Sequence, residues 1–417
     1  MDRLVIDGGR PLRGTIPVSG SKNAALPILI ATLLTEEACR IENVPRLRDI
    51  RTTIRLLEAL GKRVVQKGHT VEVLRGRPLR TQVPYEIEKQ MRASVLAAGP
   101  LLTRFGHVRV PIPGGCAIGL RPIDIHLKGF EELGARRSSE GGDIILSAER
   151  LRPGRASLRF ASVGATENLM MAAAGLPGRT LILNAAREPE IEDLAAFLGR
   201  MGARVIGAGS SRIEVHGSLR LRGCRHRVIP DRIEAGTFLI ACAAAGGRLR
   251  LAGAEPRHLA AVIGKLRAAG ARVRVRPGGI EIESRSRPRA VSVETAPHPW
   301  FPTDLQAPWM SLMCLSRGTS RIHETVFENR FLHAAELSRM GARIRVRGNA
   351  AVVEGVERLS GAPIMASDIR AGAALLVAAL AARGRTTIHR VYHIDRGYER
   401  VEAKLRRAGA RIRRSRA

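Results

Sequence analysis

One pattern of hydrophobic and polar positions recurs six times along the chain. In each copy an amphipathic segment such as DLAAFLGRMGAR runs up to a glycine, and in the first five copies two short segments of alternating polarity follow it. The intervals between successive glycines are 73, 68, 68, 71 and 68 residues, and these glycines are Gly61, Gly134, Gly202, Gly270, Gly341 and Gly409. So regular a spacing predicts a chain built from six structural repeats.

The pattern predicts the same elements in every repeat. The apolar stripe before the glycine indicates a helix that packs on a core. A glycine at this place is typical of the left-handed stop at the C-terminus of a helix. The two alternating segments, joined by a turn with Gly or Asn, are typical of a β-hairpin. We therefore expect an α/β (α+β) fold made of helix-and-hairpin units.

The two ends of the chain are expected to meet. The sixth repeat stops at RIRRSRA, before its second strand, whereas DRLVIDGGRPLRGTIPVSG at the start has strand-like alternation with no helix before it. We expect this first segment to complete the sixth repeat, which closes the chain on itself. Three repeats in each half then predict two similar inverse α/β domains, one of residues 1–20 and 230–417 and one of residues 21–229 that carries the loop around Cys116. Crossings near Ser19 to Ser21 and near Arg227 to Gly236 imply an active-site cleft that opens and shuts.

Two long apolar runs complete the pattern. AALPILIATLL and AGAALLVAALAA are shorter than the roughly 20 residues that a membrane-spanning helix needs, so they are interpreted as buried helices. The start of the chain lacks the charged and then apolar pattern of a secretory signal. We expect a cytoplasmic protein with no membrane partner.

Composition narrows the choice of partners and cofactors. The formal charge of +31, from 69 basic and 38 acidic residues, favours either nucleic acid or an anionic small molecule as ligand. The basic residues are spread along the whole chain and aromatic residues make up only 3%, so a stacking platform for nucleic acid is not expected. The five cysteines form no C-x-x-C pair, and no phosphate-binding, dinucleotide-binding or H-E-x-x-H motif is present. We expect reduced thiols, no metal and no cofactor.

Cys116 is the first candidate for chemistry. It stands in PIPGGCAIGLRPIDIH, where glycines allow tight turns that leave a thiol unshielded. The charge of Arg121 favours the thiolate, which suits a nucleophile or a proton donor. An inert buried cysteine is the alternative, and we prefer it for the other four.

Further cations stand near the starts of expected helices. SGSKNAALP places Lys22 and Asn23 at a helix start, which favours an anion, although Asn23 alone is equally well explained as a cap. Arg92, Arg370 and Arg396 are each equally well explained as partnered structural charges. Together with Lys22 and Arg121 they suit a substrate that carries phosphate and carboxylate groups.

Two aspartates accompany these cations. Asp304 lies in the proline-rich segment TAPHPWFPTDLQAP, which is expected to be irregular. It is a candidate general base, although a lone loop aspartate is more often a cap. Asp368 stands two residues before Arg370 in DIRAGAALLVAAL.

Taken together, these phrases resemble the family of UDP-N-acetylglucosamine 1-carboxyvinyltransferases, which are enolpyruvyl transferases. The resemblance runs from end to end and rests on SGSKNAALPIL, MRASVLAAGPLLTRFG, PGGCAIGLRPIDIHLKGFEELGA, SVGATENLMMAA, NAAREPEIEDLA, PDRIEAGTFL, TAPHPWFPTDLQAP, TVFENRF and YHIDRGYERVE. It implies two inverse α/β domains of three repeats each. It also implies transfer of an enolpyruvyl group from phosphoenolpyruvate to the 3-hydroxyl of UDP-N-acetylglucosamine. Phosphate leaves through a tetrahedral intermediate and no cofactor takes part, in the first committed step of peptidoglycan precursor synthesis.

The resemblance also assigns roles to residues. Cys116 matches the loop cysteine that adds to phosphoenolpyruvate, has been assigned proton transfer and reacts with fosfomycin. Asp304 matches the aspartate usually assigned as base, and Asp368 an aspartate needed for turnover. Phosphoenolpyruvate is gripped by the residues that match Lys22, Arg121 and Arg396, with Arg92 and Arg370 beside them. The positions implied to bind the nucleotide sugar are Asn23, Arg121, Pro122, Asp124, His126, Ser162, Val163, Gly164 and Val326.

Two other functions stay open at this point. Phe160 stands where the family often has a lysine, so an enolpyruvyl transferase of secondary metabolism that acts on a different uridine nucleotide is one alternative. The charge of +31 makes a basic nucleic-acid-binding protein on the same scaffold a remote second.

Overall fold

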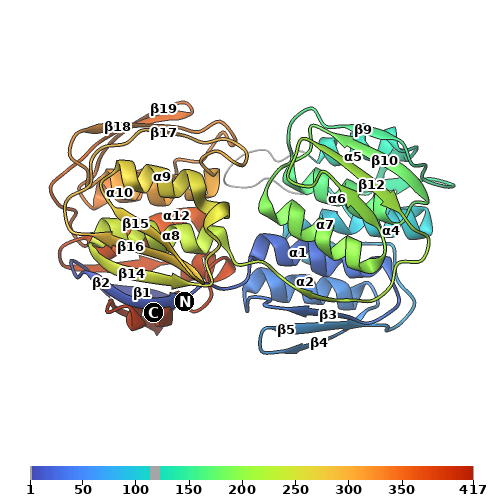
Figure 1. Cartoon of the computed structure of the whole chain (residues 1–417), viewed down its shortest axis with the longest axis horizontal. Helices are drawn as coiled ribbons and strands as arrows, with labels where there is room; N and C mark the ends of the chain where they lie inside the picture. The colour runs from blue at the N-terminus through green and yellow to red at the C-terminus, as the bar shows by residue number, and fades with distance from the viewer. Residues whose placement is uncertain (1, 113–122, 417) are drawn as a thin grey trace. The chain divides into compact units, whose positions relative to one another are not determined.

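The computed structural model describes residues 2–112 and 123–416, which form two compact units (Figure 1). The terminal unit contains residues 2–19 and 230–416 and so holds both chain ends. The middle unit contains residues 20–112 and 123–229. Each unit has a hydrophobic core of its own.

The six predicted repeats are present, three in each unit. The amphipathic helices that end at the repeated glycines are α2 (Arg48–Ala59), α5 (Asp124–Glu132), α7 (Pro189–Met201), α9 (Ala260–Ala268), α11 (His333–Arg339) and α13 (Val401–Arg407). All six glycines have a positive φ, between 87° and 116°. This is the left-handed region that glycine enters without a steric penalty, which confirms the predicted helix stop.

The predicted hairpins follow the glycines. They are β4 (Arg63–Lys67) with β5 (Thr70–Leu74), β7 (Arg136–Glu140) with β8 (Asp143–Ser147), β11 (Arg204–Ile206) with β12 (Arg212–Gly217), β15 (Arg272–Arg276) with β16 (Gly279–Ser284), and β19 (Arg343–Arg347) with β20 (Ala350–Glu354). The second strand of each hairpin also pairs with the strand before the amphipathic helix. Those strands are β3 (Cys39–Glu42), β6 (His107–Pro111), β10 (Gly178–Leu183), β14 (Gly247–Ala252) and β18 (Thr319–His323).

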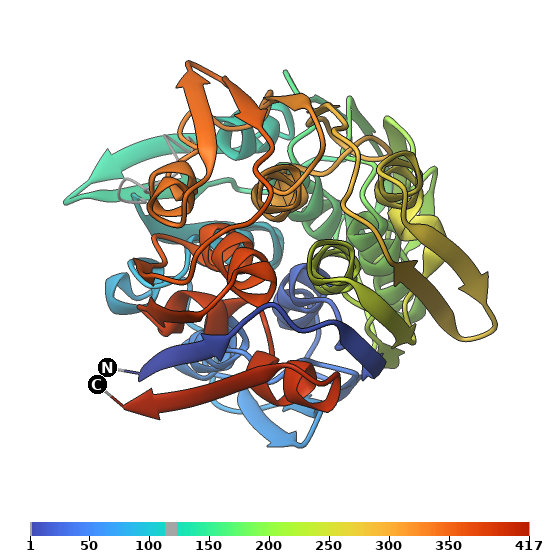
Figure 2. The ribbon, with the colours of Figure 1, turned by 90° about the vertical axis from the view of Figure 1, so that its left-hand side faces the viewer.

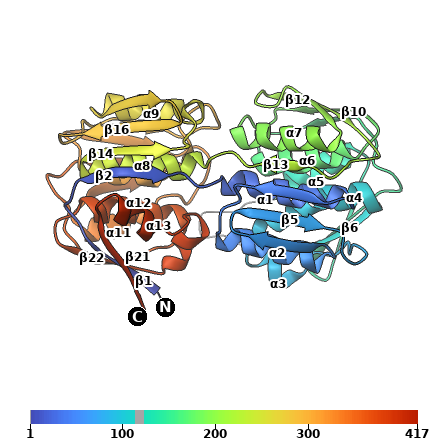
Figure 3. The same ribbon diagram turned by 60° about the horizontal axis from the view of Figure 1, so that its bottom comes forward.

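The chain closes on itself through its first strand. β1 (Asp2–Asp7) lies between β22 (Arg385–His389) and the C-terminal β23 (Arg411–Arg416), and it pairs with both in antiparallel fashion. This strand therefore completes the sixth repeat, as expected. β2 (Leu12–Pro17) does not, because it pairs in parallel with β14 of the fourth repeat (Figure 3). The expectation that the whole first segment serves the last repeat was wrong for β2.

An exchange of edge strands explains the position of β2. In three other repeats a short parallel edge strand directly precedes the buried helix of the same repeat, and these strands are β9 (Arg155–Ser157), β17 (Val293–Glu294) and β21 (Pro363–Met365). β13 (Arg225–Arg227) precedes the fourth repeat in the sequence but pairs with β3 of the first. β2 fills the edge position that β13 leaves in the fourth repeat.

Three further helices form the centre of each unit. They are α1 (Lys22–Ala31), α4 (Ala98–Phe105) and α6 (Val163–Ala174) in the middle unit, and α8 (Arg232–Ala245), α10 (Gln306–Met313) and α12 (Ile369–Ala381) in the terminal unit. Figure 2 looks roughly along the helices of the terminal unit. The apolar runs AALPILIATLL and AGAALLVAALAA fall on α1 and α12, whose residues are almost all buried. They are core helices, as predicted, and within residues 2–112 and 123–416 no helix has the length and apolar character to cross a membrane.

The central helices of the terminal unit point in the same direction. Their C-terminal ends line one depression of about 1010 Å³, which includes Ala245, Leu315 and Ala381. At the other end, Asp304 before α10 contacts Arg370 in the first turn of α12 at 2.6 Å. The N-terminal ends of α10 and α12 therefore lie together, and most of the candidate residues lie at such ends.

Short helices complete the description. They are η1 (Thr32–Leu34), α3 (Tyr85–Glu88), η2 (Arg92–Ala97), η3 (Pro256–Leu259), η4 (Thr303–Leu305) and η5 (Val391–Arg396). The proline-rich segment is thus not wholly irregular, because Asp304 lies in the 3-10 turn η4. Pro302 and Pro308 fit this arrangement, since one precedes η4 and the other stands in the first turn of α10, where no backbone N–H is needed.

Candidate functional site

The N-terminal ends of the buried helices carry most of the candidate residues. Lys22 and Asn23 open α1, Ser162 caps α6, and Asp368 caps α12. Backbone N–H groups in the first turn of a helix have no partner inside the helix, and the helix dipole places partial positive charge there. These ends favour anionic groups, which agrees with the cations expected to surround an anionic substrate.

Lys22 is held in place within the middle unit. Its Nζ lies 3.3 Å from Oδ2 of Asp49 on α2, and both side chains are buried. The helix begins at Lys22 because the Oγ of Ser21 accepts a hydrogen bond from the N–H of Ala24 at 3.3 Å. The ammonium group therefore has a fixed position at the start of α1.

His126 lies against the first turn of α6. Its Nδ1 accepts a hydrogen bond from Nδ2 of Asn168 at 3.1 Å, which assigns the ring proton to Nε2 by the hydrogen-bond network. A Cβ at Gly164 would lie 3.2 Å from Cε1 of this ring, so glycine allows the close approach. Asn168 also accepts from the N–H of Gly99 at 2.8 Å and thereby links α4, α5 and α6.

Asp124 and Phe160 lie near the same two helices. Oδ2 of Asp124 pairs with the Arg159 guanidinium at 2.8 Å, while Oδ1 is buried without a hydrogen-bond partner among the described residues. The same guanidinium lies over the Phe160 ring at 5.8 Å, and Phe160 is 52% exposed. A cation thus stands directly beside Phe160, at Arg159.

A buried acidic group follows on α6 and α7. Burial raises the pKa of Glu167 well above its ordinary value, and the neighbouring charges of Glu190 and Glu188 raise it further. Burial and these like charges therefore both favour the neutral form of Glu167. The sequence analysis did not single out these three residues, although two of them stand in the phrase NAAREPE.

Asp304 of the terminal unit is held by two arginines. Its Oδ1 lies 2.6 Å from the Arg330 guanidinium and its Oδ2 lies 2.6 Å from the Arg370 guanidinium. Both arginines are buried, whereas the Asp304 side chain is 25% exposed. Burial lowers the pKa of Arg370 and is the largest single effect, but the charge and hydrogen bond of Asp304 together with the charges of Tyr398 and Asp231 outweigh it, so the pKa is raised. The result is a carboxylate fixed by two cations with part of its surface accessible.

Asp368 acts as a helix cap in the same unit. Its Oδ1 accepts hydrogen bonds from the N–H groups of Arg370 at 2.8 Å and Ala371 at 3.0 Å. His333 on α11 is close enough to respond to it: burial lowers the pKa of His333 to about 4, the charge of Arg330 lowers it as well, and the charge of Asp368 opposes both. His333 is thus neutral around neutral pH.

Glu324 organises the loop that contains Val326. Its Oε1 accepts hydrogen bonds from Thr295 Oγ1 at 2.9 Å and from the Val326 N–H at 2.8 Å, and its Oε2 accepts from Thr303 Oγ1 at 2.9 Å. Thr303 directly precedes Asp304, so one buried carboxylate fixes the backbone near both candidate residues. Val326 itself is exposed.

The remaining candidates are placed only in part. Arg396 ends η5. Arg92 opens the 3-10 helix η2 rather than an α-helix, because α4 begins later, with Pro100 in its first turn. Its side chain, and the whole of Cys116, Arg121 and Pro122, lie outside the described residues.

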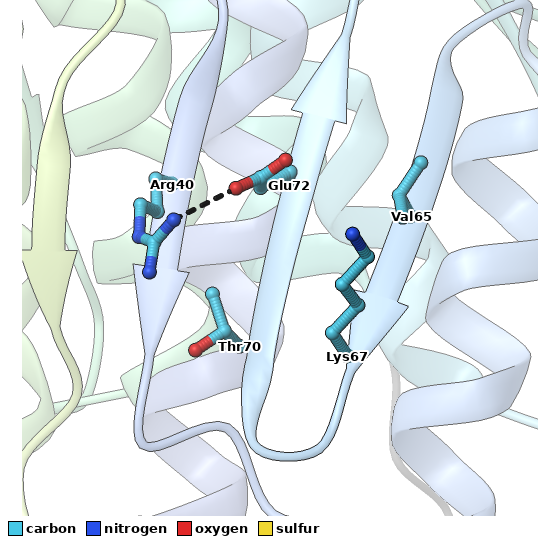
Figure 4. Close-up of a pocket in the computed structure, with 5 residues that line it drawn as sticks. All are labelled: Arg40, Val65, Lys67, Thr70 and Glu72. Carbon is cyan, nitrogen blue, oxygen red and sulfur yellow. Dashed lines mark hydrogen bonds and ion pairs between the residues drawn. The ribbon is translucent and has the colours of Figure 1, made fainter.

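Two depressions on the surface lie away from these residues. One is the depression at the C-terminal ends of the terminal-unit helices. The other, of about 220 Å³, lies on the outer face of the sheet that contains β3, β4 and β5 (Figure 4). There Arg40 pairs with Glu72 at 2.9 Å. Among the described residues, no candidate lines either depression.

Several proteins similar to this chain are UDP-N-acetylglucosamine 1-carboxyvinyltransferases. A relative from Nitratidesulfovibrio vulgaris (strain Hildenborough), a UDP-N-acetylglucosamine 1-carboxyvinyltransferase, is 55% identical over 415 residues, which is 99% of each chain. Relatives of the same name from Anaeromyxobacter sp. (strain Fw109-5) and Elusimicrobium minutum are 54% and 51% identical; the first match covers 100% of both chains, and the second covers 99% of this chain and 98% of the relative. Residues 6–405 match the model of the EPSP synthase (3-phosphoshikimate 1-carboxyvinyltransferase) family.

Solved structures agree with the architecture. The enolpyruvyl transferase NikO from Streptomyces tendae superposes with a TM-score of 0.88 at 26% identity, covering 100% of this chain and 99% of NikO. EPSP synthase from Acinetobacter baumannii superposes with a TM-score of 0.77 at 18% identity and full coverage of both chains. The second likeness concerns the fold alone.

Proposed function

Because this chain belongs to the UDP-N-acetylglucosamine 1-carboxyvinyltransferases among the enolpyruvyl transferases, we propose that it makes enolpyruvyl-UDP-N-acetylglucosamine. The donor is phosphoenolpyruvate, the acceptor is the 3-hydroxyl of the sugar, and phosphate is released. This reaction supplies peptidoglycan synthesis. We further propose that the enzyme acts in the cytoplasm, because its donor is phosphorylated. The observation that carries the proposal is the 55% identity over 99% of both chains with a relative of that name.

The first group of candidate residues is proposed to bind phosphoenolpyruvate. We assign the phosphate and carboxylate of phosphoenolpyruvate to Lys22, Arg121 and Arg396, with Arg92 and Arg370 beside them. Multiply anionic ligands of this kind need several cations and helix N-termini. The fixed position of Lys22 at the start of α1 supports its assignment as a ligand of phosphoenolpyruvate.

The addition step needs one proton donor and one acceptor. Protonation of the methylene carbon of phosphoenolpyruvate makes the neighbouring carbon electrophilic, and the sugar hydroxyl then adds there while it loses its own proton. We assign the donor to Cys116 and the acceptor to Asp304. The tetrahedral adduct next loses phosphate together with a proton from the methyl group, which restores the double bond. Asp304 suits its role because two guanidinium groups orient it and part of it remains accessible.

The nucleotide sugar is assigned mainly to the middle unit. Asp124, His126 and the first turn of α6 lie close together there, and α6 begins with the N-cap Ser162, Val163 and Gly164. The free N–H groups of this turn suit a diphosphate. Asn23, Pro122 and Val326 complete the proposed set.

One assay tests the proposal directly. Purified protein is mixed with phosphoenolpyruvate and UDP-N-acetylglucosamine, phosphate release is followed, and the nucleotide product is identified by mass. Phosphate together with the enolpyruvyl sugar nucleotide is expected. No phosphate release with this acceptor, together with phosphate release in the presence of uridine monophosphate, would instead support the alternative substrate that Phe160 suggests.

Two controls make the assay specific. Asp304→Asn should reduce kcat strongly, because the amide cannot accept the hydroxyl proton. Cys116→Ser should abolish covalent labelling by fosfomycin, and wild-type labelling of this variant would refute the assignment of Cys116.

An electrophoretic mobility shift assay at about physiological salt tests the remote nucleic-acid alternative, because contacts to phosphates alone weaken steeply with salt.

A further inference from the structure

Two cysteines outside the proposed machinery lie side by side in the middle unit. Cys39 opens β3, and Cys224 directly precedes β13. The two strands pair in parallel with Arg40 opposite Arg225, so Cys39 and Cys224 are the next pair in the same register. The N–H of Arg40 donates to the carbonyl of Cys224 at 2.9 Å. The pairing of the two strands therefore holds the two cysteines next to each other. This observation does not depend on the proposed function.

The backbone arrangement suits a disulfide. Neighbouring strands lie about 4.8 Å apart, and a disulfide joins Cα atoms that are about 4.4–6.8 Å apart. Successive side chains of a strand point to opposite faces. Arg40 points to the outer face that Figure 4 shows, so Cys39 points to the buried face. There the Cys224 thiol lies within hydrogen-bonding range of the Cys39 thiol.

The surroundings favour a thiolate on Cys39. The hydrogen bond from Cys224 lowers the pKa of the Cys39 thiol against the effect of burial, and the ammonium group of Lys62 lowers it further. Lys62 is itself buried, with Nζ 2.5 Å from the carbonyl oxygen of Thr35. A thiolate is the form that reacts with oxidants. Cys39 is buried, whereas Cys224 is partly exposed, so Cys224 is the more accessible member of the pair.

The other two described cysteines differ in each of these respects. Cys242 in α8 and Cys314 directly after α10 are fully buried in the terminal unit, and burial raises the pKa of each thiol to about 12. Neither is expected to react in the folded protein. They provide internal controls for the pair in the middle unit.

We propose that Cys39 and Cys224 form an oxidisable dithiol that closes to an intramolecular disulfide when the protein meets a peroxide. The Cys39 sulfur attacks one oxygen of hydrogen peroxide, the O–O bond breaks, and water leaves after it takes up one proton, so Cys39 becomes a sulfenic acid. The Cys224 sulfur then attacks the Cys39 sulfur, the S–O bond breaks, and a second water leaves with the proton of the Cys224 thiol. Two thiols and one peroxide thus give one disulfide and two waters.

The cross-link would act on a particular part of the fold. β13 is the last strand of the middle unit before the chain passes to the terminal unit at residues 229–230. A disulfide would tie this edge strand to β3. Slower hydrogen exchange of the Arg225–Arg227 amides is the expected consequence in the oxidised protein.

The test uses the full chain with Cys116→Ser, which leaves four cysteines. The folded protein is treated with hydrogen peroxide, and the remaining thiols are blocked with N-ethylmaleimide in denaturant before trypsin digestion. Two of the four thiols should be lost, together with two hydrogen atoms per molecule. Cleavage after Lys22, Arg40, Arg222 and Arg225 should yield residues 23–40 joined to residues 223–225. Dithiothreitol should restore all four thiols.

Matched variants decide between outcomes. Adding Cys224→Ser should prevent the cross-link and stop the reaction at a Cys39 sulfenic acid, which dithiothreitol returns to the thiol, whereas Cys242→Ser should leave the cross-link unchanged. Four free thiols after oxidation, a sulfinic acid on Cys39 without a cross-link, or a disulfide between other cysteines would each overturn the proposal. None of these readouts depends on enolpyruvyl transfer, so a negative result here is distinguishable from failure of the proposed function.

Discussion

The carboxylate of Asp304 lies between two buried guanidinium groups, one of which no sequence pattern singled out. Arg370 stands at a recognisable helix start, whereas Arg330 lies in an irregular segment between β18 and α11. The Arg330 Nε is buried without a hydrogen-bond partner among the described residues, and its guanidinium lies 4.9 Å from the Phe327 ring. A buried polar group without a hydrogen-bond partner costs free energy. A role for Arg330 in positioning the proposed base explains why this cost is tolerated.

Arg330→Gln is expected to reduce kcat by on the order of 100-fold with a smaller change in KM. The variant removes one of the two cations that orient Asp304, so the carboxylate loses its fixed direction and the acidic limb of the pH profile should move to higher pH. Arg330→Lys should restore part of the activity. Steady-state kinetics across pH measures both effects, with Arg339→Gln as the control, since Arg339 is an exposed arginine on α11. Equal losses in Arg330→Gln and Arg339→Gln would contradict the positioning role.

His333 predicts a pH dependence of stability. Burial, aided by the charge of Arg330, lowers its pKa in the folded state to about 4 against an ordinary value of 6.5. Between these two pH values the unfolded chain binds a proton that the folded protein does not, so stability must fall as the pH falls through this window. The full loss, reached below about pH 4, is about 3 kcal/mol.

Urea unfolding between about pH 4.5 and 7.5 measures this effect. His333→Gln should flatten the dependence in that window, whereas His107→Gln, at an exposed position that opens β6, should leave it unchanged. The same slope in both variants would show that other groups cause the loss.

At the scale of the elements, the repeated glycines are the strongest local signal. Gly341 after α11 has a φ of +94° and open space around it, so its conformation alone demands glycine. Gly341→Ala should therefore cost about 1–2 kcal/mol of unfolding free energy. Gly264, an exposed glycine inside α9 with equally open space, should respond in the opposite sense. Gly264→Ala should gain about 0.5–1 kcal/mol because alanine favours the helix.

Thermal or denaturant unfolding of the two variants measures this contrast. The two substitutions are chemically identical and both sites have room for the methyl group, so sterics cannot account for a difference. Destabilisation by both, to the same extent, would count against the left-handed stop.

The elements that the sequence predicted share a local cause. The signal for a helix, a left-handed glycine and a hairpin depends only on residues close together in the sequence. Six copies could therefore be recognised without knowledge of the fold. Parallel pairing is not local, and alternation in β2 does not specify its partner β14. For the same reason Lys22 and Arg370 were identifiable at helix starts, whereas Asn168, Glu324 and Arg330 gain their meaning only from residues distant in the sequence.

At the scale of the whole molecule, the two units differ in how the chain forms them. The described part of the middle unit lies within residues 20–229, so all of it emerges before the last repeat is made. The terminal unit needs β1 from the start of the chain and β23 from its end. The sheet of the sixth repeat, in the order β21-β22-β1-β23, is closed by β1. The terminal unit therefore cannot complete its core until synthesis ends.

Ile6→Ala tests this closure. Ile6 is fully buried in β1 and pairs with Ile412 and Thr386, so its truncation should cost about 2–4 kcal/mol. The matched control is Val71→Ala in β5, which is also fully buried and occupies the corresponding place in the sheet β13-β3-β5-β4. Because each unit has its own core, hydrogen exchange should accelerate in β22 and β23 for Ile6→Ala, and in β3 and β4 for Val71→Ala. Acceleration of all these strands by either substitution alone would show that the two units unfold as one, and that closure by β1 stabilises the whole chain rather than the terminal unit.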